Sequence, residues 1–161
     1  MAESDVLKYG TTDGKTDEVF TQGAFAASVK LLAKSGRFVV YDASDGYWKA
    51  ADNDATQISG FVDEVMTASA TAGATKLPIR RVQERTFELP YAAEGAAAAL
   101  TAAVGKTLIG KLIDLYVDAN GYQYADNLAT PLQKILRVEA SNVARNTLAV
   151  SVIDSAIAQQ A

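Results

Sequence analysis

Short apolar stretches alternate with polar, turn-forming stretches along most of the chain. The segment RFVVY at residues 37–41 is β-branched and aromatic, the polar segment DASDG at 42–46 follows it, and YWKAA at 47–51 resumes the apolar pattern. Two such runs joined by Asp, Ser and Gly are typical of a hairpin, because these residues tolerate tight backbone angles. Residues 37–51 are therefore predicted to form a β-hairpin.

Further strands are expected after this hairpin. Gly60 lies inside the first of them, where it indicates a bulge or a close approach of two backbones. Asn120 and Gly121 are the strongest hairpin signal in the chain, because both adopt the positive φ angles of a tight turn. The remaining predicted strands lie at residues 57–68, 76–82, 85–91, 111–117, 122–125, 132–140 and 146–154, with the second and third forming a pair.

The alanine-rich segment EGAAAALTAAV at residues 94–104 is the one strong helix signal, because alanine has the highest helix propensity. Glu94 suits the start of this helix and Gly105 its end. The triplet Gly105-Lys106-Thr107 is similar to the end of a phosphate-binding loop. That motif needs a further glycine at position 100, where this chain has Leu100, and it follows a strand rather than a helix. We interpret the triplet as a helix end leading into a strand.

About eight short strands with one brief helix favour a mainly β fold, either a compact β-barrel or a β-sandwich. Residues 1–24 lack strand or helix periodicity and are predicted to form an extended N-terminal arm. Residues 25–161 are predicted to form a single β-rich domain with a short C-terminal tail. The arm also carries apolar residues that a solvated tail would not need: Val6, Leu7, Tyr9, Val19 and Phe20.

The amino-acid composition narrows the classes of function that are open to this protein. The 161 residues include no His and no Cys, which excludes Ser-His-Asp and Cys-His catalysis and Cys-ligated zinc. No apolar run reaches the length of a membrane span, and the acidic, polar N-terminus does not resemble a secretory signal. A net charge of −4 argues against general nucleic-acid binding. We therefore expect no catalytic residues, cofactor, metal, nucleic-acid partner or membrane partner.

Two groups of carboxylates were weighed as sites. Asp42, Asp45, Asp52 and Asp54 are dense enough for calcium, but counting from Asp42 puts Tyr47 and Asn53 where an EF-hand needs glycine and glutamate. Two polar turns at one end of a barrel explain them as well. Asp114 and Asp118 could support hydrolysis or, with neighbouring tyrosines, bind a sugar. A solvated surface is the simpler interpretation. The tyrosines concerned are Tyr116, Tyr122 and Tyr124.

Four basic residues fall within ten positions, offset only by Glu84. They are consistent with a solvated charged face, a docking patch for an acidic protein surface, or a nucleic-acid patch. The last would need aromatic residues interleaved with the bases, and none occurs before Phe87. The four residues are Lys76, Arg80, Arg81 and Arg85, and they form the possible protein-contact patch.

The order of these pieces resembles the head-decoration, or capsid cement, proteins of tailed bacteriophages, including the lambda-type decoration fold. The resemblance is carried by SGRFVVYDASDGYWKAADNDATQISGFVDEVMTAS at 35–69 and TKLPIRRVQERTFELPY at 75–91. The later segments, 86–127 and 135–153, are similar to longer phage capsid-associated β-barrel proteins.

The resemblance implies a structural virion protein that binds the outer capsid surface and stabilises the expanded head. Its partner would be the major capsid protein, its oligomer a trimer, and its assembly would take place in the host cytoplasm. By position alone, the arm residues Val6, Leu7, Tyr9, Val19 and Phe20 would contact the coat. The alternatives are another virion subunit, of the tail tube or the head–tail joint, and a carbohydrate-binding or hydrolytic β-module.

Overall fold

The computed structural model describes residues 19–53 and 55–158, and in these ranges the protein is mainly β. The expected β class and the single short helix are confirmed. There are thirteen strands in the described ranges, more than the eight or so expected, because several strands contain only two residues.

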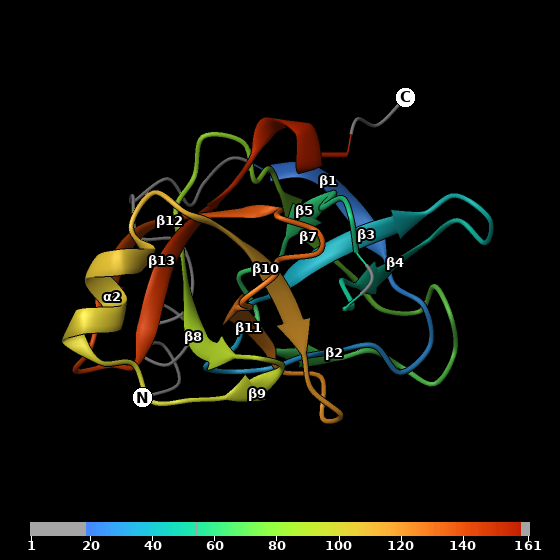
Figure 1. Ribbon diagram of the computed structural model, residues 1–161. Helices are drawn as coiled ribbons and strands as arrows, with labels where there is room; N and C mark the ends of the chain where they lie inside the picture. Colours follow the sequence, from blue (N-terminus) through green and yellow to red (C-terminus); the bar gives the residue numbers. More distant parts are fainter. Residues whose placement is uncertain (1–18, 54, 159–161) are drawn as a thin grey trace.

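Five strands close into a barrel, which Figure 1 shows on its left and centre. Their order is β11, β10, β12, β13, β8, and a parallel pairing between β8 and β11 joins the two ends. Closure removes the exposed edges that an open sheet would present. The strands are β8 (Phe87–Ala93), β10 (Leu112–Val117), β11 (Gln123–Asn127), β12 (Leu136–Asn142) and β13 (Thr147–Val152), and the short β9 (Ala96–Ala97) extends β8.

A second sheet of five strands lies beside the barrel (Figure 1). Its order is β1, β7, β5, β3, β4, and a single parallel bridge between Phe25 and Trp48 connects its two ends. This sheet therefore also curls almost into a ring. Its strands are β1 (Val19–Ala24), β3 (Phe38–Asp42), β4 (Tyr47–Ala50), β5 (Gly60–Phe61) and β7 (Lys76–Arg80), and β2 (Lys30–Leu31) pairs separately with β6 (Met66–Thr67).

Both faces of β3 are buried at its start, which explains the apolar run around residue 38. Phe38 packs into the larger core cluster, here called the barrel core, and Val39 packs into the smaller one, the sheet core. Neighbouring residues of a strand point to opposite faces, so a strand with two buried faces is apolar throughout. Phe87 of the barrel contacts Phe38 and Phe61 edge-on, with ring centroids 4.9 and 4.7 Å apart.

Gln123 joins the barrel to the second sheet. Its side chain accepts a hydrogen bond from the Phe38 backbone N–H at 2.9 Å and donates to the carbonyls of Phe38 and Ala51 at 3.0 and 3.1 Å. Its own backbone pairs with Ser35 and Gly36. Because Gln123 is fully buried, these bonds are shielded from water and fix the relative position of the two sheets.

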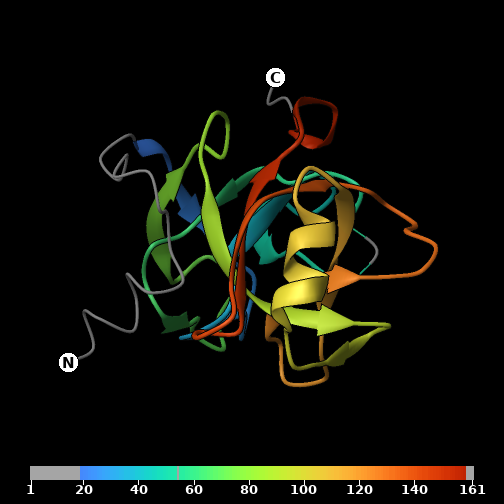
Figure 2. The same ribbon diagram turned by 60° about the vertical axis from the view of Figure 1, so that its left-hand side comes forward.

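The helix prediction at 94–104 is wrong in position, because α2 spans Ala102–Leu108. Glu94 and Gly95 have positive φ angles of 52° and 74° and form the turn between β8 and β9. Thr101 caps the helix by accepting a hydrogen bond from the backbone N–H of Val104. Figure 2 shows α2, in yellow, lying along the outside of the barrel.

Gly105 therefore lies inside the helix and does not end it. A Cβ at this position would come 2.6 Å from Ser141 Oγ and 3.0 Å from Ser141 Cβ. The glycine of the Gly105-Lys106-Thr107 triplet thus allows α2 to pack closely on β12, and the triplet is not a turn around a phosphate.

Two predicted hairpins are confirmed and one predicted pair is wrong. The strand pairs β3–β4 and β10–β11 lie where residues 37–51 and the turn at Asn120 and Gly121 predicted them. By contrast, β7 pairs with β1 and β5, whereas β8 pairs within the barrel. The strands at 76–82 and 85–91 therefore belong to different sheets.

Both ends of the described chain pair with the body of the protein. β1 begins at Val19 and pairs with β7, so residues 19–24 belong to the sheet and not to an arm. At the other end, Ile58 bridges Ile157, and the backbone N–H of Ala158 donates to the Ile58 carbonyl at 2.9 Å. The chain is therefore held against residue 58 as far as Ala158.

Candidate functional site

The outer face of β10 and β11 holds the residues that were weighed as a hydrolytic or sugar-binding site. Tyr116 and Tyr124 are directly opposite each other, with ring centroids 5.7 Å apart. Asp118 opens the turn and accepts hydrogen bonds from the backbone N–H groups of Asn120 and Tyr122 at 2.9 and 3.0 Å. Burial raises the pKa of the Tyr124 hydroxyl, with a further contribution from the Asp118 charge. Asp118 therefore stabilises the turn between β10 and β11.

Asp114 was expected on a solvated surface, but it is only 2% exposed. Its carboxylate accepts three hydrogen bonds from consecutive backbone N–H groups, those of Leu132, Gln133 and Lys134, at 2.7, 3.1 and 2.7 Å. These bonds hold the loop before β12 against the barrel. Asp114 and Asp118 are therefore both occupied by backbone donors, and neither is placed as a general acid or base facing an open site.

Asp126 is a buried carboxylate that the sequence did not single out. It lies directly opposite Asp114 in the β10–β11 pair and accepts a hydrogen bond from the Gly95 backbone N–H at 3.2 Å. Burial raises the pKa of Asp126, the Gly95 bond opposes this, and the charges of Asp114 and Glu94 raise it further. Glu94 in turn accepts from the Ala129 backbone N–H at 2.6 Å. The three acids therefore fasten two loops to one side of the barrel.

The acidic turn after β3 is organised around a lysine. Lys49 Nζ lies 2.6 Å from Asp42 Oδ2 and 2.7 Å from Asp45 Oδ2. The bond from Lys49, helped by Ser44, lowers the pKa of Asp42. Within the described ranges no group of three or more acidic, His or Cys residues is arranged to hold a metal ion. Asp52 lies exposed in the next turn, and Asp54 lies outside the described residues.

The four-residue protein-contact patch does not form one exposed surface. Lys76 and Arg81 are exposed, Arg80 is half-buried, and Arg85 is only 3% exposed. Arg80 Nε lies 2.8 Å from Asp63 Oδ2. Lys76 and Arg81 are therefore the exposed members of this set, whereas Arg85 is part of the interior.

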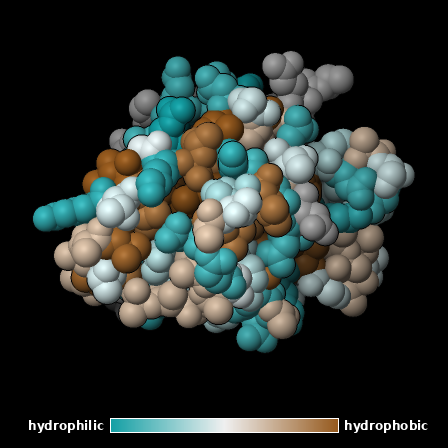
Figure 3. Space-filling view, in the orientation of Figure 1, coloured by the Kyte–Doolittle hydropathy of each residue, from teal (hydrophilic) through white to brown (hydrophobic). Residues whose placement is uncertain are grey.

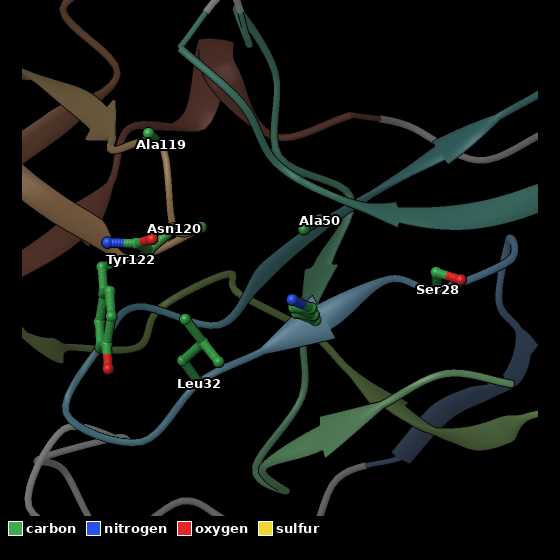
Figure 4. A pocket seen from close by; sticks show the side chains of 8 residues that line it. Ser28, Leu32, Ala50, Ala119, Asn120 and Tyr122 are labelled. Atoms are coloured by element: carbon green, nitrogen blue, oxygen red, sulfur yellow. The ribbon is translucent and has the colours of Figure 1, made fainter. Parts of the chain in front are cut away.

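The structure has an open groove of about 620 Å³ between the second sheet and the barrel. Ser28, Lys30 and Leu32 line one side, and the turn from Ala119 to Tyr122 lines the other. Figure 4 shows Leu32 and Tyr122 at one end of the groove and Ser28 at the other. Lys30 is its one charged lining residue among those described, and Ser28, Asn120 and Tyr122 are its uncharged polar ones.

Apolar groups on the surface are scattered. On the face shown in Figure 3 they form separate groups among polar residues. Leu132, 75% exposed, lies in the loop that Asp114 holds, and Ile109 follows α2. The α-helix of the described ranges, α2, has seven residues, too few to span a bilayer.

Comparison with protein-family models, with curated proteins and with solved structures finds no match to this chain. Of the residues assigned to the arm, Val6, Leu7 and Tyr9 lie outside the described residues. Val19 and Phe20 belong to β1.

Sequence reasoning missed the buried polar residues that organise the fold. Glu88 is buried; it accepts a hydrogen bond from Thr147 at 2.6 Å and pairs with Arg145 at 2.8 Å. Gln123 could have been found from strand periodicity, because it shares an inward-facing parity with the buried Ala125. Asp126 carried no comparable signal.

Proposed function

We propose that this protein is a structural virion component that binds the outer surface of a bacteriophage capsid and stabilises the expanded head. In this proposal its partner is the major capsid protein, and it acts as a trimer without performing chemistry. The identity of the lattice rests on the resemblance of residues 25–154 to decoration proteins. The proposal of a structural role rests on buried polar side chains that form hydrogen bonds within the fold.

One observation carries the structural role. Asp114, a carboxylate weighed for hydrolysis, is almost fully buried and holds three backbone N–H groups. A carboxylate that is buried and bonded to the backbone in this way is not positioned to contact a substrate. The polar residues of the described barrel maintain its shape, as a binding module that recognises a surface requires.

The proposed attachment combines a rigid body with the segment before Val19. A coat lattice offers many copies of one site, and a buried area of about 1,000 Å² or more per copy is sufficient for specific binding. Val6, Leu7 and Tyr9 supply apolar side chains, and an extended segment can add a strand to an exposed sheet edge of the coat. The exposed bases Lys76 and Arg81 can contribute a contact with an acidic coat surface.

The test uses purified expanded shells, from the phage that carries this chain, that lack the protein. We expect saturable binding at a fixed number of copies per coat subunit, and a higher temperature of shell disruption when the sites are filled. No binding, or binding with no change in shell stability, would contradict the proposal.

A matched pair of variants locates the contact. Replacement of Leu7 and Tyr9 by serine should weaken shell binding by about tenfold or more, because each loses buried apolar area in the complex. Leu132→Ser removes an exposed apolar side chain from the barrel surface and serves as the control, with binding unchanged. Equal effects of the two changes would remove the arm from the proposal.

A further inference from the structure

The open groove between the second sheet and the barrel has polar side chains on both of its walls. Ser28 and Lys30 lie on one wall, and Asn120 and Tyr122 lie on the other (Figure 4). Within residues 19–53 and 55–158, the side chains of these four residues form no hydrogen bond or ion pair. The groove therefore offers polar groups that the fold itself does not use.

The first wall is an extended segment held from behind. β2 pairs with β6 over Lys30 and Leu31, and the Ser28 backbone N–H donates to the Ser69 carbonyl at 2.9 Å. Leu31 packs into the sheet core, so the alternate residues 28, 30 and 32 face the groove. At about 3.3 Å per residue, this wall is about 13 Å long.

The second wall is the turn between β10 and β11. The Asp118 carboxylate accepts hydrogen bonds from the Asn120 and Tyr122 backbone N–H groups, and the Asp118 carbonyl accepts one from Gly121 at 3.0 Å. A Cβ on Gly121 would lie 3.9 Å from Leu32 Cδ1, so the turn lies close to the first wall at this end of the groove. Both walls are thus held by the fold itself, which reduces the cost of ordering a binding site.

The chemistry of the lining suits a ligand that is acidic and rich in hydroxyl groups. Lys30 is exposed and is the one charged lining residue among those described, so it favours an anion. The Asn120 amide and the Ser28 hydroxyl can each donate and accept, as sugar hydroxyls do. The half-buried Tyr122 has an apolar ring with a polar tip, and the C–H face of a pyranose can pack on such a ring.

The dimensions and the lining favour a saccharide over a peptide. The volume of about 620 Å³ falls within the range of about 300–1,000 Å³ that is typical of small-ligand sites. An extended peptide binds mainly through main-chain hydrogen bonds to the edge of a sheet. Here the groove is lined by side chains from the β2 segment, from Ala50 at the end of β4 and from the turn.

We propose that this groove binds a short acidic saccharide. Lys30 would contact the carboxylate, Ser28 and Asn120 the hydroxyl groups, and Tyr122 the face of a sugar ring. The site differs from the pair of aspartates weighed from the sequence, because both of those carboxylates are bonded to backbone N–H groups. It goes beyond the capsid role and does not depend on it.

A titration of the ¹⁵N-labelled full-length protein with digalacturonic acid, followed by NMR, tests the proposal. We expect saturable shifts of backbone amide signals that are confined to residues 28–32 and 119–122. The dimethyl ester of the same disaccharide keeps the rings and lacks the charges. It should bind about tenfold more weakly, because it cannot form a charged contact with Lys30.

Two variants with matched controls assign the contacts. Lys30→Gln should weaken binding of the acid about tenfold and leave binding of the ester nearly unchanged. Tyr122→Leu should weaken binding of both about fivefold, because the ring contact is lost. Lys111→Gln and Tyr41→Leu make the same changes at exposed positions outside the groove lining and should bind as the unmodified protein does.

Several outcomes would overturn the proposal. One is the absence of saturable shifts at up to about 10 mM disaccharide, a concentration that detects millimolar affinity. Others are shifts centred elsewhere, equal binding of acid and ester, or equal losses in Lys30→Gln and Lys111→Gln. Triglutamate that binds the groove as tightly as the sugar would show an acidic peptide site instead. If Tyr122→Leu does not fold, the comparison of acid and ester on the unmodified protein decides. Binding to capsid shells is measured separately, so either proposal can fail alone.

Discussion

The barrel strands bury carboxylates, whereas the buried arginines lie outside the strands. The buried ionisable groups of the described barrel strands are Glu88, Asp114 and Asp126, whereas Arg37 precedes β3 of the second sheet and Arg85 precedes β8 of the barrel. Asp114 is stabilised by backbone N–H groups held in a fixed loop. The arginines are grouped around Asp63. Asp114 and Asp126 are therefore held by backbone N–H groups, whereas the arginines surround a carboxylate side chain.

Gln123 is the point at which the two regions depend on each other most. Gln123→Leu keeps the volume but leaves the Phe38 N–H and the carbonyls of Phe38 and Ala51 without partners. At about 1–3 kcal/mol for each buried group left unsatisfied, we expect the free energy of unfolding to fall by about 3–5 kcal/mol. Urea unfolding would measure it, with Gln133→Leu, in a half-buried loop position, as the control. A loss below about 1 kcal/mol would show that the regions do not need this joint.

Two glycines allow the close packing of the second sheet to be compared with that of the barrel. A Cβ on Gly60 would come 2.5 Å from Ile79 Cγ2 and 2.9 Å from the Arg80 carbonyl oxygen. Gly60→Ala should therefore cost about 2–3 kcal/mol in the free energy of unfolding, because backbone atoms cannot move aside.

Gly105→Ala, in the helix that packs on the barrel, should cost less. The contact is with the Ser141 side chain, and replacing glycine inside a helix gains about 1 kcal/mol of helix propensity. Adding Ser141→Gly should remove the remaining cost. Thermal unfolding of the three variants would rank them, and a larger loss at Gly105 than at Gly60 would contradict this comparison.

Asp114 tests whether the buried acids of the barrel hold its loops. Asp114→Asn retains one acceptor oxygen but loses the charge that strengthens three hydrogen bonds, and we expect a loss of about 1–2 kcal/mol. Hydrogen exchange at Leu132 and Lys134 should accelerate more than exchange elsewhere. Uniform acceleration would show a general loss of stability instead of release of this loop.

Asp126 should give the smallest effect, visible as a pH dependence. Burial raises its folded-state pKa above the unfolded value, so the folded protein binds this proton more tightly. Its contribution to stability should therefore increase as pH falls through the raised pKa, and level off near the unfolded value of about 3.9. Asp126→Asn should lack this increase. Urea unfolding of the unmodified protein and of Asp126→Asn across this pH range would measure the difference. Identical pH profiles for the two proteins would show that Asp126 does not titrate in this way.

Local turn chemistry made part of the fold predictable. The β3–β4 and β10–β11 hairpins follow from Asp, Ser, Asn and Gly at the turns. The helix was misplaced because the alanine run favours a helix by propensity, while Glu94 and Gly95 adopt positive φ angles and turn the chain into β9. Alanine propensity is weak beside the pairing of a strand with its neighbour.

The long-range features could not be read from the sequence. β7 and β8 are adjacent in the chain, yet each pairs with strands far away, and no local signal encodes those partners. The role of Asp114 depends on a loop eighteen residues further on. Arg85 looked like part of an exposed basic run, and only the packing of the second sheet against the barrel buries it.

The central claim is that this protein acts by attaching to a repeating protein surface. An electron-microscopy map of the phage particle proposed to carry the chain tests it most directly. The account predicts density for the barrel and its neighbouring sheet at regular positions on the outside of the head, with the N-terminal arm on the coat protein. Density for this fold inside the tail or at the head–tail joint, or a particle with none, would contradict it.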